Sequence, residues 1–213
     1  MIVGFLLTLV AAYLVGSIPT GYLVARAKGV DLRAHGSGNI GATNAFRVLG
    51  KGPGIFVLLM DAFKGAAAVN WVPLLTAGWV SGNAATYLPL VAGIGAILGH
   101  NYTCWLRFKG GKGIATSAGV MGALLPWALV IALSTWFLVL VISRYMSIAS
   151  IMAAVALPIG TYFTTSNRAL WVLAGVLGGM AIWRHRGNIQ RLRAGTEPRF
   201  EFRSKRSDTA TSS

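Results

Sequence analysis

The sequence predicts an all-helical integral membrane protein with about seven transmembrane helices, two of them short, and with glycine-rich loops on the cytoplasmic side. Three observations lead to this fold class. The 213 residues are 55% hydrophobic and only 11% charged, whereas a soluble domain carries roughly 25% charged residues. The apolar residues form long runs, and short basic segments separate these runs. The net charge of +14 favours anionic partners such as lipid head groups or phosphates.

Six apolar runs approach or exceed the length of about 20 residues that a helix needs to cross a ~30 Å hydrocarbon core. The first run lacks the basic start of a cleavable signal peptide and is too long for one, so we expect it to remain as a membrane span. We expect residues 1–195 to form one membrane-embedded domain and residues 196–213 to be a polar, basic, disordered tail. In chain order the apolar runs cover residues 2–25, 54–75, 84–105, 113–143, 146–165 and 169–183.

The run at 113–143 is long enough for two helices, and the positions of the basic residues favour that interpretation. Lys and Arg prefer the cytoplasmic side, and they concentrate in 26–52, in 106–112 and in the tail. A single span over 113–143 would place Arg144 and the tail outside. Two short helices that turn near Pro126 return both to the inside, because proline breaks the helical ladder. We therefore expect the N-terminus outside, and the C-terminus and the glycine-rich loops inside.

Two glycine-rich segments resemble nucleotide-binding loops, but their context argues against that function. HGSGNIGATN at 35–44 contains the spacing G-x-G-x-x-G, and Asp61 follows Gly41 by twenty residues. A dinucleotide fingerprint requires a strand before the glycines and a parallel sheet around them. Here apolar helices are expected on both sides, and Asp61 lies within one. KGGKG at 109–113 lacks the glycine and the Ser/Thr that a Walker loop requires.

An anion-binding site explains these segments better. Glycines allow successive backbone N–H groups to converge on one point, and a third basic segment, RHRGN at 184–188, is expected on the same side of the membrane. Ordinary loops that obey the positive-inside rule are the alternative, which we prefer for Arg26, Lys28, Arg33 and most of the tail. The candidate donors, cations and bases are Ser37, Asn39, Thr43, Asn44, Arg47, Lys112, His185 and Asn188.

The small number of acidic residues limits the available chemistry. Asp61 is the only acid within a predicted span, and Lys64 lies three residues on, which favours a buried ion pair. A second carboxylate for paired acid–base catalysis is missing, and the histidines and Cys104 lack metal-ligand spacing. We therefore expect no metal and no cofactor. An enzyme of this kind would need an activated substrate, which it would hold with cations and backbone dipoles.

GSGNIGATN with its following arginine, GHNYTCWLRFKGGKGIAT and the His–Asn element near the end resemble the three motifs of the bacterial acyl-phosphate:glycerol-3-phosphate acyltransferases, the PlsY family. GSIPTGYLVAR, DAFKG and RYMSIASI resemble further family signatures, so the likeness runs from residue 16 to about residue 195. It implies transfer of a fatty acyl group from acyl phosphate to the sn-1 hydroxyl of glycerol 3-phosphate, in the bacterial inner membrane. The products would be lysophosphatidic acid and phosphate, in the first acylation step of phospholipid biosynthesis.

The resemblance also assigns roles to residues. It implies that Ser37, Arg47, Lys112, His185 and Asn188 are catalytic, and Glu197 matches the acid of the third motif. We expect direct transfer with the Ser37 hydroxyl as a hydrogen-bond donor; whether His185 or the donor's phosphate takes the proton stays open. The expected substrate-binding residues are Gly36, Gly38, Asn39, Gly41, Thr43, Asn44, Lys64, His100, Gly110, Gly111, Thr116 and Ser150.

The implied partners are acyl phosphate, glycerol 3-phosphate and membrane lipid, with the soluble enzyme that makes acyl phosphate (PlsX) as a candidate protein partner. A transporter for phosphorylated solutes is the alternative function, but its site would lie at the midplane between inverted repeats, and no such repeat is visible. Nucleic acid is not expected as a partner, because the positive charge follows the loops and lacks interleaved stacking aromatics.

Overall fold

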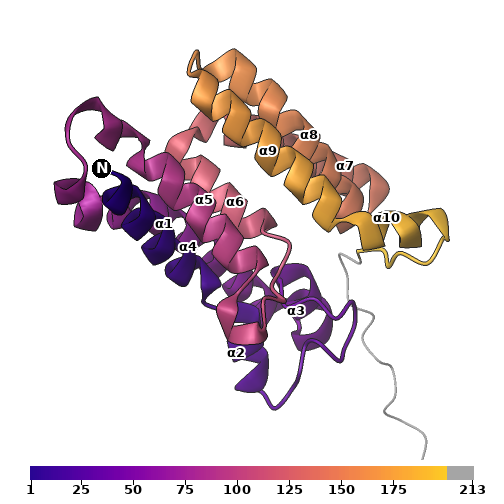
Figure 1. Cartoon of the computed structure of the whole chain (residues 1–213). Coiled ribbons are helices and arrows are strands. Elements are labelled where there is room, and N and C mark those ends of the chain that lie inside the picture. The colour runs from indigo at the N-terminus through magenta and orange to yellow at the C-terminus, as the bar shows by residue number, and fades with distance from the viewer. Residues whose placement is uncertain (201–213) are drawn as a thin grey trace, which may run out of the picture.

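The computed structural model describes residues 1–200, which form a bundle of helices with no strand in that range (Figure 1). The C-terminal part of the expected tail, with Ser213, lies outside the described residues. Short 3₁₀ turns occur at Ala77–Trp79, Gly82–Tyr87 and Cys104–Leu106. The helices are α1 (Ile2–Ser17), α2 (Thr20–Arg26), α3 (Ala42–Leu49), α4 (Lys51–Thr76), α5 (Leu88–Asn101), α6 (Ile114–Leu124), α7 (Pro126–Ser143), α8 (Met146–Thr164), α9 (Arg168–Arg184) and α10 (Arg186–Arg193).

Within the described residues, five helical segments are long and apolar enough to cross a membrane: Ile2–Arg26, Lys51–Trp79, Gly82–Leu106, Pro126–Ser143 and Met146–Thr164. Helices α6 and α9 also belong to the bundle but have only 11 and 17 residues. The integral membrane fold is thus confirmed, while the count of seven spans stays a prediction.

The predicted break in the long apolar run is present at the expected position, but the lengths of the two helices differ from the expectation. Helix α6 ends at Leu124, and Pro126 is the first residue of α7, where its missing N–H costs nothing. Of the two helices in this run, only α6 is short. The proline lies near the start of the run and leaves 18 residues for α7. The first predicted span is also interrupted, at Ile18 and Pro19, which separate α1 from α2.

Glycines bring the helices of the first half into close contact. Helix α1 packs on α5, and α4 packs on α6. A Cβ atom on Gly16 or Gly99 would collide with backbone atoms across the α1–α5 contact, and one on Gly65 or Gly119 would collide across the α4–α6 contact. Small residues of this kind are typical of helix packing in membranes, where close approach maximises van der Waals contact.

The second half packs as α7 on α8 and α8 on α9, beside the first half in Figure 1. The core contains residues of both halves, among them Ala96 of α5, Val120 of α6 and Leu177 of α9. Large apolar side chains cover the outside instead, including Leu75, 78% exposed, and Phe163, 76% exposed. An exterior this apolar is suited to lipid rather than to water.

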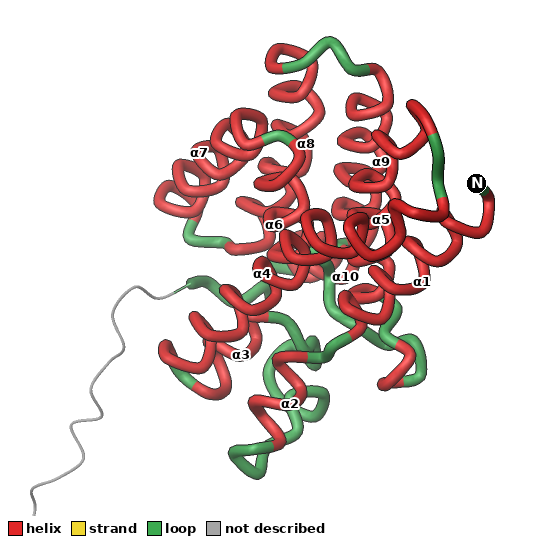
Figure 2. Tube along the Cα trace, turned by 90° about the vertical axis from the view of Figure 1, so that its left-hand side faces the viewer, coloured by secondary structure: helices red, strands yellow, loops and turns green. Residues whose placement is uncertain are grey.

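The three motif segments lie at one end of the bundle. Helices α2 and α3 with their long loops extend from that end in Figure 2. The chain returns there after α5, and α10 follows α9 at the same end. Residues 196–200 also pack there: the Phe200 N–H donates to the Arg144 carbonyl at 2.6 Å, and Arg199 Nε donates to the Tyr145 hydroxyl at 3.0 Å. Arg144 therefore lies at the end that holds the motif segments, as the two-helix interpretation requires, whereas a single span over 113–143 would place it at the opposite end.

Candidate active site

The loop before α3 is shaped by the side chain of Asn44. Its Oδ1 accepts the Ser37 N–H at 2.9 Å, and its Nδ2 donates to the carbonyls of Leu32 and His35 at 3.1 and 3.0 Å. Asn44 is 1% exposed. The Asn44 amide is therefore fully used in hydrogen bonds to the loop backbone. One of these bonds fixes the backbone of Ser37.

The remaining polar residues of this loop are closer to solvent. The side chains of Ser37, Thr43 and Arg47 are exposed. Gly36 and Gly38 flank Ser37 with φ of +60° and +68°, a left-handed conformation that glycine adopts without strain. Asn39 Oδ1 accepts the Gly41 N–H at 2.8 Å, just before α3 begins. The loop thus presents a hydroxyl next to the N-terminal N–H groups of a helix, an arrangement suited to anions.

The 109–113 loop lies against the end of α5. The Gly110 N–H donates to the Asn101 carbonyl at 3.2 Å, and the Gly111 N–H donates to the His100 carbonyl at 3.0 Å. A Cβ atom on Gly111 would collide with the His100 ring. These two glycines therefore allow the loop backbone to lie directly against the end of α5. This packing fixes the position of the next residue, Lys112.

Lys112 belongs to a chain of hydrogen bonds that crosses from this loop to the third segment. Its ammonium donates to Asn188 Oδ1 at 2.5 Å. Asn188 Nδ2 donates to Glu197 Oε1 at 2.6 Å, and Arg191 Nε donates to Glu197 Oε2 at 2.8 Å. An ionised carboxylate only accepts, so Glu197 fixes the orientation of the Asn188 amide and turns its oxygen toward Lys112.

Burial and neighbouring charges set the protonation of this cluster. Burial lowers the pKa of Lys112 to about 8; Glu197 opposes the shift, and the charges of Arg191, Arg184 and Arg47 add to it. Burial raises the pKa of Glu197, but the hydrogen bonds from Asn188 and Arg191 outweigh that effect and the net pKa is lowered. The charge of Arg47 reaches Lys112, so the end of α3 and the 109–113 loop contribute to one cationic site.

His185 connects α9 with α10 and is 3% exposed. Its Nδ1 lies 2.8 Å from the Ala181 carbonyl, and because a carbonyl only accepts, Nδ1 carries the hydrogen and Nε2 is the acceptor. Burial and the charge of Lys112 lower the pKa of His185 to about 4. The imidazole is therefore neutral near pH 7.

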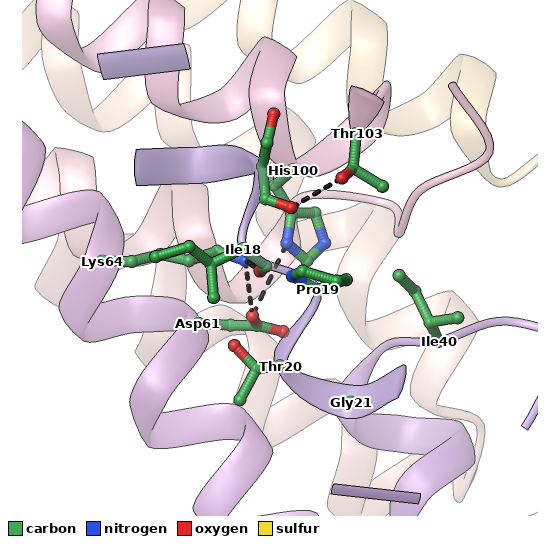
Figure 3. A pocket seen from close by; sticks show the side chains of 10 residues that line it. Ile18, Pro19, Thr20, Gly21, Ile40, Asp61, Lys64, His100 and Thr103 are labelled. Atoms are coloured by element: carbon green, nitrogen blue, oxygen red, sulfur yellow. Dashed lines mark hydrogen bonds and ion pairs between the residues drawn. The ribbon is translucent and has the colours of Figure 1, made fainter. Parts of the chain in front are cut away.

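Asp61, Lys64 and His100 form a separate buried cluster, seen in Figure 3. Asp61 Oδ1 lies 2.8 Å from Lys64 Nζ and 3.6 Å from His100 Nδ1. The Lys64 ammonium also donates to the Ile18 carbonyl at 2.7 Å, at the break between α1 and α2. The ion pair expected from the sequence is thus present, and it stabilises an interrupted helix; contact of Lys64 and His100 with substrate stays a prediction.

Replacing Asp61 with asparagine is expected to destabilise the fold by about 3–5 kcal/mol, because it leaves the buried Lys64 ammonium without its counter-ion. Thermal unfolding of the purified protein in detergent measures the loss. Asp31→Asn, at a solvent-exposed pair with Arg33, is the matched control and should leave the midpoint unchanged. The double variant Asp61→Asn with Lys64→Met should recover most of the loss. An unchanged midpoint for Asp61→Asn alone would contradict the assignment.

Two further candidates lie inside the bundle. Thr116 is fully buried on α6, where it faces Gly65 of α4. The Ser150 hydroxyl accepts the Trp136 indole N–H at 3.3 Å between α8 and α7. One turn earlier on α8, the buried Ser147 lies beside Glu197 and thus nearer to the Lys112 cluster. A substrate contact of Ser150 or Thr116 stays a prediction.

Comparison with known proteins decides the family. The model of the family described as glycerol-3-phosphate acyltransferase matches residues 6–195. The chain belongs to this family. A glycerol-3-phosphate acyltransferase of Thermosynechococcus vestitus is 44% identical over 198 residues, which cover 89% of this chain and 92% of the relative. One from Desulforudis audaxviator is 48% identical over 196 residues, with 90% and 93% covered.

Two crystal structures of PlsY, an integral membrane glycerol 3-phosphate acyltransferase, are similar over nearly the whole fold. The glycerol 3-phosphate form is 38% identical with a TM-score of 0.83, covering 92% of this chain and 96% of that chain. The lysophosphatidic acid form is 36% identical with a TM-score of 0.81, covering 92% and 95%. The resemblance to the PlsY family that the motifs indicate is therefore confirmed.

One residue that the sequence analysis of this family member did not single out, Arg184, also contacts the 109–113 loop. Arg184 lies beside the carbonyls of Asn101, Gly110 and Gly111. Its position directly before His185 in RHRGN was a signal, but the positive-inside rule already explained a basic residue at a helix end. Glu197 was recognised as a match to the third motif, and the structure adds its bond to Asn188.

Proposed function

We propose that this chain transfers a fatty acyl group from acyl phosphate to the sn-1 hydroxyl of glycerol 3-phosphate, giving lysophosphatidic acid and phosphate. The observation that carries the proposal is the cationic site at one end of a lipid-facing bundle, where Lys112 is held by Asn188 and lies close enough to the neutral His185 to lower its pKa. The relatives named glycerol-3-phosphate acyltransferase, and the glycerol 3-phosphate and lysophosphatidic acid forms of PlsY, support this choice of acceptor and product.

Two phosphates must meet at one carbonyl in this reaction. Two unit charges of the same sign 6 Å apart repel by about 3 kcal/mol at an effective dielectric of 20, and each phosphate carries up to two. Arg47 and Lys112 offset that repulsion. Ser37 and the neighbouring N–H groups donate to a phosphate or to the developing oxyanion. The donor is already activated as a mixed anhydride, so the acceptor hydroxyl attacks it directly.

The proton of the attacking hydroxyl needs an acceptor. His185 is neutral and has a free Nε2, but a base with a pKa of about 4 binds a proton only weakly at neutral pH. The phosphate of the donor gains charge as the acyl bond breaks and is the stronger base. We therefore favour the leaving phosphate as the proton acceptor, with His185 as a hydrogen-bond acceptor that orients the hydroxyl.

The membrane supplies one substrate and the solvent supplies the other. The exposed apolar exterior supports access of an acyl chain from the lipid, and the exposure of Arg47 and Ser37 supports access of glycerol 3-phosphate from water. The concentration of Lys and Arg at this end favours the cytoplasmic side of a bacterial inner membrane, with the N-terminus outside. The soluble enzyme that makes acyl phosphate (PlsX) is then the candidate partner that delivers the donor.

Radiolabelled glycerol 3-phosphate with purified protein in detergent tests the reaction. Acyl phosphate should support the formation of labelled lysophosphatidic acid, and acyl-CoA alone should not. Equal turnover with acyl-CoA would overturn the donor assignment. Absence of product, with uptake of label into liposomes that contain the protein, would favour a transporter instead.

The pH dependence should show the state of Lys112. Its pKa of about 8 means that the ammonium is present below pH 8 and is lost above it, so kcat/KM for glycerol 3-phosphate should fall above about pH 8. A bound phosphate stabilises the charged form, so the corresponding limb of kcat should lie at higher pH. Lys112→Arg is the matched control, because arginine keeps its charge in this range. The fall of kcat/KM above about pH 8 is the basic limb of the profile. The same basic limb in Lys112→Arg would contradict the assignment to Lys112.

A further inference from the structure

Two glycines precede Lys112, and they leave its loop with unusual conformational freedom. The bonds from the Gly110 and Gly111 N–H groups to the end of α5 fix one side of this loop. The carbonyls of the same two glycines accept hydrogen bonds from another part of the chain. Such a contact limits the freedom of the loop and keeps Lys112 in place.

The guanidinium of Arg184 meets these carbonyls. Its Nη2 lies 3.3 Å from the Asn101 carbonyl and 3.2 Å from the Gly110 carbonyl, and the Gly111 carbonyl is a third, closer partner. Asn101 is the last residue of α5, where carbonyls without a partner inside the helix concentrate partial negative charge that attracts a cation. The guanidinium also lies over the Tyr102 ring, 5.3 Å from its centroid.

The position of Arg184 in the chain links the two halves of the site. It ends α9 and directly precedes His185, whereas its partners belong to the 109–113 loop. We propose that Arg184 is a positioning residue, a clamp that joins the Lys112 loop to the His185 segment through backbone carbonyls. Its hydrogen bonds are made to the protein, so it acts on the reaction through Lys112. The proposal rests on the function proposed above.

Lysine is a poor replacement for such a clamp. The three carbonyls lie around one nitrogen, Nη2, and the planar guanidinium also lies over the Tyr102 ring. An ammonium is a compact point charge on a differently shaped side chain, so it loses the ring contact and does not reach the carbonyls from the same position. A displacement of about 1 Å at a reacting group can cost about 10²-fold in rate. Arg184→Lys is therefore expected to lower kcat/KM by about 10–100-fold while leaving the basic limb near pH 8.

Arg184→Gln removes the charge as well as the clamp. Since the charge of Arg184 lowers the pKa of Lys112, this variant should lose activity and also move the limb to higher pH. Arg186→Lys is the matched control, because Arg186 is exposed and its guanidinium lies over the Trp183 ring, away from the 109–113 loop. It should retain the wild-type rate and pH profile.

Amine labelling of Lys112, followed by mass spectrometry across a pH series, gives a readout that does not depend on turnover. The midpoint should rise in Arg184→Gln and stay in place in Arg184→Lys. Wild-type protein that makes no lysophosphatidic acid would overturn the proposed function. The labelling midpoint of Lys112 would still test whether Arg184 acts on the Lys112 loop. Activity of Arg184→Lys within twofold of wild type, or an unmoved midpoint in Arg184→Gln, would overturn the clamp.

A variant that loses its helical circular dichroism has not folded and cannot test the clamp. In that case hydrogen–deuterium exchange of the wild-type protein is the test. The N–H groups of Gly110 and Gly111 should exchange as slowly as the last turn of α5. Exchange as fast as the exposed turn at 27–29 would show a loose loop, and the clamp would be wrong.

Discussion

Lys112→Met is expected to lower kcat/KM for glycerol 3-phosphate by about 10³-fold, within the range for removing one partner of a buried, hydrogen-bonded charge pair. Methionine keeps the length of the side chain but removes the ammonium that donates to Asn188 Oδ1. The two phosphates then face each other with less positive charge between them. The loss should appear mainly as a higher KM, because the ammonium binds phosphate in the ground state as well as in the transition state.

Lys109→Met is the matched control for this experiment. Lys109 begins the same KGGKG segment, but its side chain is exposed. Initial rates over a matrix of both substrate concentrations should show a wild-type kcat/KM for this control. Equal losses in the two variants would mean that the loop acts only through its total charge, and the specific role of Lys112 would be wrong.

The sequence predicts the helical fold well where the signal is local. Pro126 breaks a uniform apolar run, and the structure has a helix boundary there. The break at Pro19 was not predicted, although proline is again the cause. It is stabilised by Lys64, whose ammonium reaches the Ile18 carbonyl from α4, and no pattern within one apolar run contains that information.

For the site, too, the sequence predicts what depends on local signals and does not predict what depends on tertiary contacts. The motif segments identify Ser37, Lys112 and Asn188, and the charge distribution indicates that they share one end of the bundle. The side-chain directions depend on tertiary contacts and cannot be read from spacing. Asn44 looks like a ligand donor in the sequence, yet the structure shows that its amide serves the loop. Arg184 looks like an ordinary membrane-flanking arginine until its carbonyl partners are known.

Ser37→Ala is expected to lower kcat by about 10²–10³-fold, the range for removing one donor to a developing oxyanion. The hydroxyl is exposed between two left-handed glycines, while the Ser37 N–H is fixed by Asn44. A nucleophilic serine would need an oriented base beside it. His185 instead donates from Nδ1 to the Ala181 carbonyl, so among the described residues a backbone carbonyl and not a carboxylate orients its ring. We therefore expect Ser37 to donate a hydrogen bond while the acyl group passes directly to the acceptor.

Kinetics and trapping separate the donor from the nucleophile. Direct transfer through a ternary complex gives intersecting lines in double-reciprocal plots, whereas an acyl-enzyme gives the parallel lines of ping-pong exchange. Acyl phosphate without glycerol 3-phosphate should leave no label on the protein, and Ser81→Ala, exposed in the loop between α4 and α5, should behave as wild type. A trapped ester on Ser37 would refute direct transfer and leave the overall reaction intact, because either route yields the same products.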